Sequence, residues 1–231
     1  MTRATPVCHS GPMDALRGRW RADCALVAPG AEARVVDDLG RDLLRRWREP
    51  HRRYHDATHL LEVLSAVDTL CASERVVPQD RVVAALAVWF HDAVYAVRTP
   101  RTNEAESAAL AAEALALLGV DAATTERVTD LILSTATHEL RSGTAQDTTA
   151  DVVHDADLWV LGAPVSRFDE YCRQVREEYA DVPAGEYASA RSAVLRPFLV
   201  RPHVYRTTHG RRSWETAARE NLARELSRLA A

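Results

Sequence analysis

A chain of 231 residues with 47% hydrophobic and 27% charged residues has the composition of a globular protein and is long enough to bury a large core. Its formal net charge of −4 provides no basic footprint for a nucleic acid. All 29 basic residues are arginine, which excludes Schiff-base chemistry and a Walker-type phosphate loop, since both require lysine. Arginine is therefore the only side chain here that can hold an anion through two parallel hydrogen bonds.

The cysteines and the apolar runs bear on the cellular compartment. Cys8, Cys24, Cys71 and Cys172 are scattered and form no C-x-x-C pair, so we expect neither a disulfide framework nor a cysteine zinc site. The N-terminal segment lacks the apolar core of a signal peptide, and no apolar run approaches the roughly 18 residues of a membrane span. We therefore expect a cytoplasmic protein that does not enter a membrane.

Apolar residues at helical spacing dominate the first half of the chain. They predict helices over residues 13–27 and 31–48 and a third within RRYHDATHLLEVLSAVDTLCAS, residues 52–73. Pro78 then opens the segment QDRVVAALAVWFHD, which is apolar on nearly every side. Such a segment is typical of a helix in the middle of a domain.

The second half continues in the same way. Asn103 with Glu106 resembles a capping box before SAALAAEALALLG, and Gly119 is expected to end that helix. Strand signals are weak throughout. We expect one compact all-α domain over residues 1–231, with roughly nine or ten helices by this pattern. The remaining helices are predicted over 124–137, 150–161, 166–180, 187–200 and 213–230, and the loops near 98–102, 139–149, 181–186 and 202–212.

Histidines and carboxylates gather at the ends of the predicted helices and on the helices that flank the buried one. His91 and Asp92 end the buried helix itself, where both side chains are expensive to bury unpaired. His138 lies seven residues beyond Leu131, two helical turns on along the core-facing side. Several helices can therefore direct imidazoles and carboxylates at one point. The other members of the set are His55 and His59, which share a face if their helix begins early enough, and His154, Asp155 and Asp157.

A buried histidine beside a buried carboxylate is tolerated when a metal ion shares the site, because the cation compensates the charge. Imidazole and carboxylate ligands together favour no single ion. We therefore expect a divalent cation, with Mn, Fe, Co, Ni, Zn and Mg as the candidates. The competing interpretation of His91 and Asp92 is a histidine that interacts with the helix dipole beside a solvated aspartate.

The polar residues and their flanking segments resemble a known family. His59, the doublet His91–Asp92 and the later Asp157 are similar to the H…HD…D signature of the HD superfamily of metal-dependent phosphohydrolases. One bacterial subgroup of predicted phosphohydrolases resembles the chain over about residues 30–229, through the segments YHDATHLLEVL, AVWFHDAVY, NEAESA, DADLWVLG, VREEY, RSAVLRPFLVRPHVY and ARENLARELSRL. The resemblance implies that His59, His91, Asp92 and Asp157 bind the metal. Asp155 competes with Asp157, since one of the two can be a helix N-cap.

The resemblance also implies an activity, the hydrolysis of a small phosphorylated molecule, for example a nucleotide, by metal-activated water. Asp92 is expected to orient the water, and Glu104 to accept its proton, although Glu104 can equally be an exposed carboxylate at a helix start. His138 is expected to contact the phosphoryl group or, if its pKa stays near 6.5, to protonate the leaving group, the alternative being a histidine that caps its helix. His55, Arg53 and Arg191 are candidate substrate contacts, and both arginines can instead lie on the surface.

Two other function classes remain as alternatives. Some HD-fold proteins hold two irons and oxidise their substrate, but those sites need additional histidines, and here His138 and His154 are the candidates. A non-catalytic nucleotide-binding module on the same fold is the third hypothesis. Metal content and oxygen uptake distinguish the three.

Overall fold

The computed structural model describes residues 12–97, 102–138 and 147–231. These residues form eleven α-helices and the 3-10 helix η2, with no β-strand among them, which confirms the all-α prediction. None of these helices is long and apolar enough to cross a membrane. The helices are α1 (Pro12–Val27), α2 (Ala33–Arg46), α3 (Ala57–Ser73), α4 (Pro78–Phe90), α5 (Asn103–Leu117), α6 (Ala122–Ser134), α7 (Thr148–Asp157), η2 (Leu158–Gly162), α8 (Val165–Glu178), α9 (Ala184–Val200), α10 (Thr208–Ser213) and α11 (Glu215–Leu229).

The apolar helix predicted after Pro78 is the central element. Pro78 occupies the first turn of α4, where its missing N–H leaves no bond unmade. Every residue of α4 from Val82 to Phe90 is buried. The helix packs against α1, α3, α5, α6 and α7, so its last turn and the His91–Asp92 doublet end inside the molecule.

Two helix starts differ from the sequence prediction. The Asp56 carboxylate accepts hydrogen bonds from the Thr58 and His59 backbone N–H groups, so α3 begins at Ala57 and His55 lies before the helix. Asn103 does not cap α5, because its Oδ1 atom accepts the backbone N–H of Ala96 at 3.0 Å. The condition for a shared helix face of His55 and His59 is therefore not met, and the Asn103 capping box was wrong.

The end of α5 follows the prediction. Gly119 adopts a φ of 75°, a left-handed conformation that glycine reaches without strain, and the Val120 N–H bonds back to the Leu115 carbonyl. The region predicted as a loop over 202–212 contains the short helix α10. Thr207 begins it by accepting the Gly210 N–H, a single local cap that apolar spacing does not reveal.

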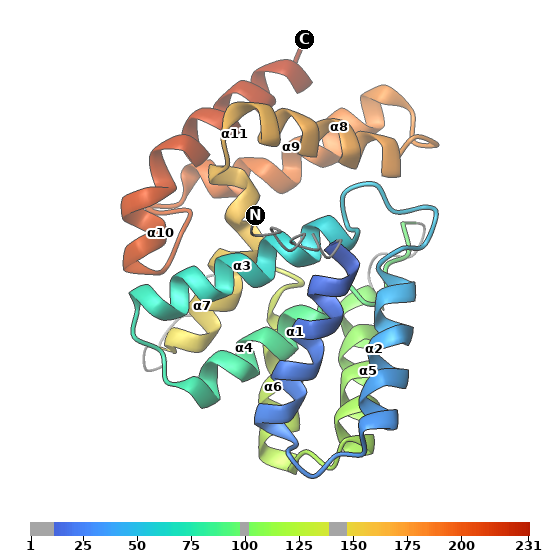
Figure 1. The fold of residues 1–231 in the computed structure, drawn as a ribbon. Helices are drawn as coiled ribbons and strands as arrows, with labels where there is room; N and C mark the ends of the chain where they lie inside the picture. The colour runs from blue at the N-terminus through green and yellow to red at the C-terminus, as the bar shows by residue number, and fades with distance from the viewer. Residues whose placement is uncertain (1–11, 98–101, 139–146) are drawn as a thin grey trace, which may run out of the picture.

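The apolar side chains form two clusters. One joins α1 to α7 around α4, and the other joins η2, α8, α9 and α11 and includes Tyr54. Figure 1 shows α8, α9 and α11 gathered at one end of the molecule, with α1, α2, α5 and α6 at the other. The chain passes from the first cluster to the second where α7 ends at Asp157 and η2 begins. The described cysteines Cys24, Cys71 and Cys172 are buried and free, and Cys8 lies outside the described residues.

Candidate metal centre

Three side chains from three helices converge on one point. His59 lies in the first turn of α3, His91 directly follows α4, and Asp157 is the last residue of α7. The His59 and His91 Nε2 atoms are 3.3 Å apart, and the Asp157 Oδ1 atom is 3.6 Å and 3.3 Å from them. Donors about 2.1 Å from a shared ion are separated by about 3.0 Å at right angles and about 3.4 Å at tetrahedral angles. This group can therefore hold a metal ion.

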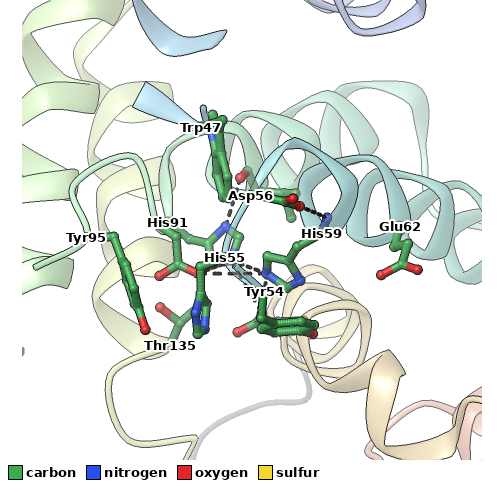
Figure 2. A network of polar contacts seen from close by, with 12 residues as sticks. Trp47, Tyr54, His55, Asp56, His59, Glu62, His91, Tyr95 and Thr135 are labelled. Carbon is green, nitrogen blue, oxygen red and sulfur yellow. Dashed lines mark hydrogen bonds and ion pairs between the residues drawn. The ribbon is translucent and has the colours of Figure 1, made fainter. Parts of the chain in front are cut away.

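The two imidazoles are fixed with their Nε2 atoms toward that point. The His91 Nδ1 atom lies 2.8 Å from the Val88 carbonyl, which can only accept, so Nδ1 carries a hydrogen, and in the neutral form of the ring it is Nε2 that has the free lone pair. Figure 2 shows both rings between the Trp47 indole and the Tyr54 ring. Trp47 is fully buried, and its indole N–H donates to the Trp89 carbonyl at 3.1 Å. Aromatic walls thus restrict both imidazoles.

Asp92 approaches the same point from the doublet. Its Oδ2 atom is 3.1 Å from the His91 Nε2 atom and 3.7 Å from that of His59. Burial opposes the charged form of all these groups, but Asp92 and Asp157 outweigh it at His91 and hold the pKa of His91 well above its usual value. The two aspartate pKa values are lowered in turn, against the effect of burial, by the charge of His91. In the protein alone the charged His91 imidazole thus compensates the two carboxylates, and a bound cation can take over that role.

His59 has a different electrostatic setting. Burial, followed by the nearby His91, lowers the pKa of His59 to about 3, so its imidazole is neutral at physiological pH. Its Nδ1 atom is buried and has no hydrogen-bond partner. A neutral, desolvated imidazole with its Nε2 atom on the shared point is the protonation state that a metal ligand requires.

Arg52 ties the segments that carry the ligands together, and the sequence analysis did not single it out. Its side chain is fully buried and donates to the backbone carbonyls of His55 at 2.9 Å, Asp92 at 2.8 Å and Ala93 at 3.2 Å. One guanidinium thus joins the turn before α3 to the doublet after α4. The neighbouring candidate Arg53 is exposed, and its side chain donates to the Pro50 and Arg52 carbonyls rather than lining the site.

Glu178, at the end of α8, holds His55 in place and was also missed. Its Oε1 atom accepts the backbone N–H groups of Arg53, Tyr54 and His55, and its Oε2 atom lies 2.7 Å from the His55 Nδ1 atom. The Tyr95 hydroxyl donates to the same Oε2 atom at 2.9 Å. Burial raises the pKa of Glu178, but the bond to His55 and the backbone donors outweigh it and lower the pKa to about 2. The carboxylate therefore directs the opposite edge of the His55 imidazole, its Nε2 atom, away from itself.

A cavity of about 300 Å³ lies against the metal group. His55, His91, Asp92, Glu104, His138, Asp157 and Arg191 all line it, so of the predicted site residues only Arg53, which is exposed, and His59, which is buried in the metal group, do not. Burial raises the pKa of Glu104, and the repulsion of Asp92 adds to this effect, whereas a backbone hydrogen bond opposes it. Glu104 is thus partly withdrawn from solvent rather than a fully exposed helix-start carboxylate.

His138 reaches the site by a route that the helical pattern did not predict. The helix α6 ends at Ser134, and His138 follows it after a turn. The φ of His138 itself is 49°, a left-handed value that is uncommon for residues other than glycine. Its Nε2 atom is 3.4 Å from the Asp157 Oδ2 atom. Burial lowers the pKa of His138 to about 4. The prediction that His138 faces the core holds, but the two-turn helical extension behind it was wrong.

The structure separates the two competing aspartates. Asp155 accepts the backbone N–H groups of Arg206 and Thr207 and the Thr207 hydroxyl, and it lies 2.8 Å from the His154 Nδ1 atom. Asp157 belongs to the metal group instead. Asp147 caps α7 ten residues before its end, and Asp157 occupies the N-cap position of η2 without a capping hydrogen bond from its side chain.

The comparisons with known proteins give no relative: no family model, no curated protein and no solved structure matches this chain. The all-helical fold and the His59–His91–Asp157 group are compatible with an HD-type domain.

Proposed function

We propose that this protein is a metal-dependent phosphohydrolase that acts on a small phosphorylated molecule. The observation that carries the proposal is the convergence of His59, His91 and Asp157 beside a cavity that also contains proton-transfer groups. When bound, a divalent ion supplies Lewis-acid polarisation of a phosphoryl oxygen and lowers the pKa of a coordinated water. Asp92 joins the three residues as the fourth ligand, because its Oδ2 atom lies 3.1 Å from the His91 Nε2 atom.

Each residue around the ion has its own role in the proposed hydrolysis. The free oxygen of Asp92 orients the attacking water, and the raised pKa of Glu104 suits a carboxylate that accepts a proton from it. His138, which is neutral because burial lowers its pKa to about 4, donates a hydrogen bond to the phosphoryl group from the Nε2 edge that faces Asp157. The Nε2 edge of His55, held by Glu178, contacts the substrate from the other wall of the cavity.

The test is a phosphatase screen with purified protein over nucleotides and phosphosugars, repeated with Mn, Fe, Co, Ni, Zn and Mg. We expect hydrolysis of at least one class, loss of activity on chelation and recovery when one ion is restored. Activity that survives verified metal removal contradicts the proposal. So does a protein that binds a metal and hydrolyses none of the compounds.

A di-iron oxygenase is the second candidate, because a second group of imidazoles lies beside Asp157. The His138 and His154 rings are 5.5 Å apart, and the His154 Nε2 atom is buried without a hydrogen-bond partner. Two irons per chain together with oxygen uptake favour the oxygenase. A protein that binds no metal at all favours the non-catalytic nucleotide-binding module.

A further inference from the structure

Arg191, in the middle of α9, is a partly buried cation without a counter-ion. It lines the cavity, donates from Nη2 to the Tyr171 hydroxyl and lies 5.0 Å over the Tyr171 ring. Its Nε atom is buried and has no hydrogen-bond partner, and no carboxylate of the described residues forms an ion pair with it. A hydroxyl and a ring compensate only part of the cost of desolvating a guanidinium.

Arg167 is a comparable arginine whose charge is paired with a carboxylate. It also lies over a tyrosine of the same cluster, 5.6 Å from the Tyr54 ring centre. Unlike Arg191, it pairs with both carboxylate oxygens of Glu62, at 2.6 Å and 2.7 Å. The missing carboxylate is therefore a property of the Arg191 position and not of arginines that stack on this aromatic cluster.

A second unsatisfied donor lies one helical turn before Arg191. Tyr187 is buried, and its hydroxyl has no hydrogen-bond partner. Residues four apart on a helix share a face, so the Tyr187 hydroxyl and the Arg191 guanidinium lie on the same side of α9. Tyr171 accepts from Arg191 and keeps its own O–H available. The place thus offers several donors, and the nearby buried carboxylate, Glu225 of α11, forms no hydrogen bond with the Tyr187 hydroxyl or the Arg191 Nε atom. Donors without a paired acid are the composition of an oxyanion site.

This place is distinct from the metal group, although both line one cavity. The Phe198 ring lies 6.2 Å from the His138 ring at the metal end, and Arg191 precedes Phe198 by seven residues, or about 10 Å along the helix axis. The cavity lining also includes four apolar side chains that belong neither to the metal group nor to the Arg191 group: Leu161, Val175, Val194 and Leu195. A ligand that touches both ends therefore has an apolar or aromatic middle.

We propose that Arg191, Tyr171 and Tyr187 form a subsite for a second oxyanion, a carboxylate or phosphate carried by the substrate at a distance from the phosphoryl group at the metal. The substrate class is then a phosphate ester whose leaving group has an apolar or aromatic body and an acidic end. This inference rests on the proposed hydrolysis for the identity of the first group. The anion subsite itself does not depend on it.

The first experiment measures anion binding without metal. Chelated protein is titrated with inorganic phosphate and, separately, with benzoate, at constant ionic strength, and the thermal midpoint is followed. We expect wild type and the paired-arginine control Arg167→Gln to respond in the millimolar range, and Arg191→Gln to lose at least 10-fold in apparent affinity.

Tyr187→Phe removes a hydroxyl without a protein partner, so the variant keeps the fold and its apparent affinity for the anion falls about 3-fold. An Arg191→Gln protein that responds like wild type overturns the subsite, and so does wild type that responds to neither anion. The stronger of the two titrations identifies the preferred acid.

The second experiment compares 4-carboxyphenyl phosphate with phenyl phosphate as substrates. Arg191→Gln is expected to raise KM for the carboxylated ester at least 10-fold more than KM for phenyl phosphate. Equal effects on the two esters contradict a distal subsite. Anion binding that depends on Arg191 in a protein without phosphatase activity supports the subsite and rejects the proposed hydrolysis, so the two failures are distinguishable.

Discussion

The two ends of the cavity carry opposite and unbalanced charges. At one end the carboxylates of Asp92, Asp157 and Glu104 line the wall, and at the other Arg191 is the only arginine among the described lining residues. At the first end only His91 is held in its charged form beside the carboxylates, and at the second no carboxylate of the described residues pairs with Arg191, whereas Arg19 and Arg167 elsewhere each pair with a carboxylate. Buried charge that the chain leaves unpaired is most simply compensated by a ligand, a cation at the first end and an anion at the second.

The ends also differ in how they are held. The metal group lies in the apolar cluster around α4, and its segments are tied by Arg52 and by the Val88 carbonyl. Arg191 belongs to α9 in the second cluster and is held mainly by a tyrosine. Glu178 bridges the two regions, since it ends α8 and binds the turn that precedes α3. A substitution at one end of the cavity should therefore leave the function of the other end intact. A substitution of Glu178 should affect the contact between the two regions.

The largest expected effect comes from removing a ligand. His91→Ala should lose bound metal and all hydrolysis, because it removes the imidazole on the most buried helix and leaves two carboxylates facing each other. Elemental analysis and turnover measure this, with the exposed His203→Ala as control. The metal-free anion response at Arg191 should persist. Full metal content and activity in His91→Ala would reject the assignment.

His138→Ala should have the next largest effect. We expect turnover to fall roughly 10²-fold, the usual scale for removing one hydrogen-bond donor that stabilises a transition state, while metal content stays near one per chain. The reason is that the His138 Nε2 atom faces the second oxygen of Asp157 and not the shared point of the ligand atoms. Loss of one of two metals in this variant would instead favour a two-metal centre.

Glu178→Gln tests the bridge between the two regions. The amide keeps the shape but loses the charge that fixes His55, so we expect kcat to fall about 10-fold with metal content unchanged. Glu215→Gln is the matched control, because Glu215 also accepts two backbone N–H groups, at Val204 and Tyr205, but lies outside the described cavity lining. Nitrogen-15 spectra of His55 should show hydrogen on Nδ1 in wild type, and a change in that pattern only in Glu178→Gln.

The smallest effect is a pH dependence of stability. The folded-state pKa of Glu178 is lowered from 4.5 to about 2, so its contribution is present above pH 4.5 and is lost as the pH falls toward 2. The shift corresponds to at most about 3 kcal/mol. Denaturant unfolding of metal-free wild type and Glu178→Gln at pH 6, 4.5 and 3 measures it. The difference in unfolding free energy should narrow as the pH falls, and a constant difference would show that Glu178 is not held in its charged form.

The sequence predicted the features that depend on local pattern. Helical spacing gave the all-α fold and the buried helix before His91, and the order of the motifs gave the residues that the structure gathers as His59, His91 and Asp157. Contacts between residues far apart in the sequence could not be predicted from helical spacing or from the order of the motifs. Glu178 contacts the His55 region across 123 residues, and nothing in the periodicity of α8 marks it. Arg52 and Arg53 are adjacent and chemically alike, so only the fold shows which one is buried.

The central claim is that one divalent ion is bound by the converging ligands, and anomalous diffraction from crystals grown with Mn²⁺ or Zn²⁺ tests it most directly. The account predicts a single strong peak about 2.0–2.3 Å from the Nε2 atoms of His59 and His91 and from a carboxylate oxygen of Asp157, with Asp92 in the same coordination sphere. Absence of a peak at this point in metal-saturated crystals, or a peak held by other residues alone, would contradict it.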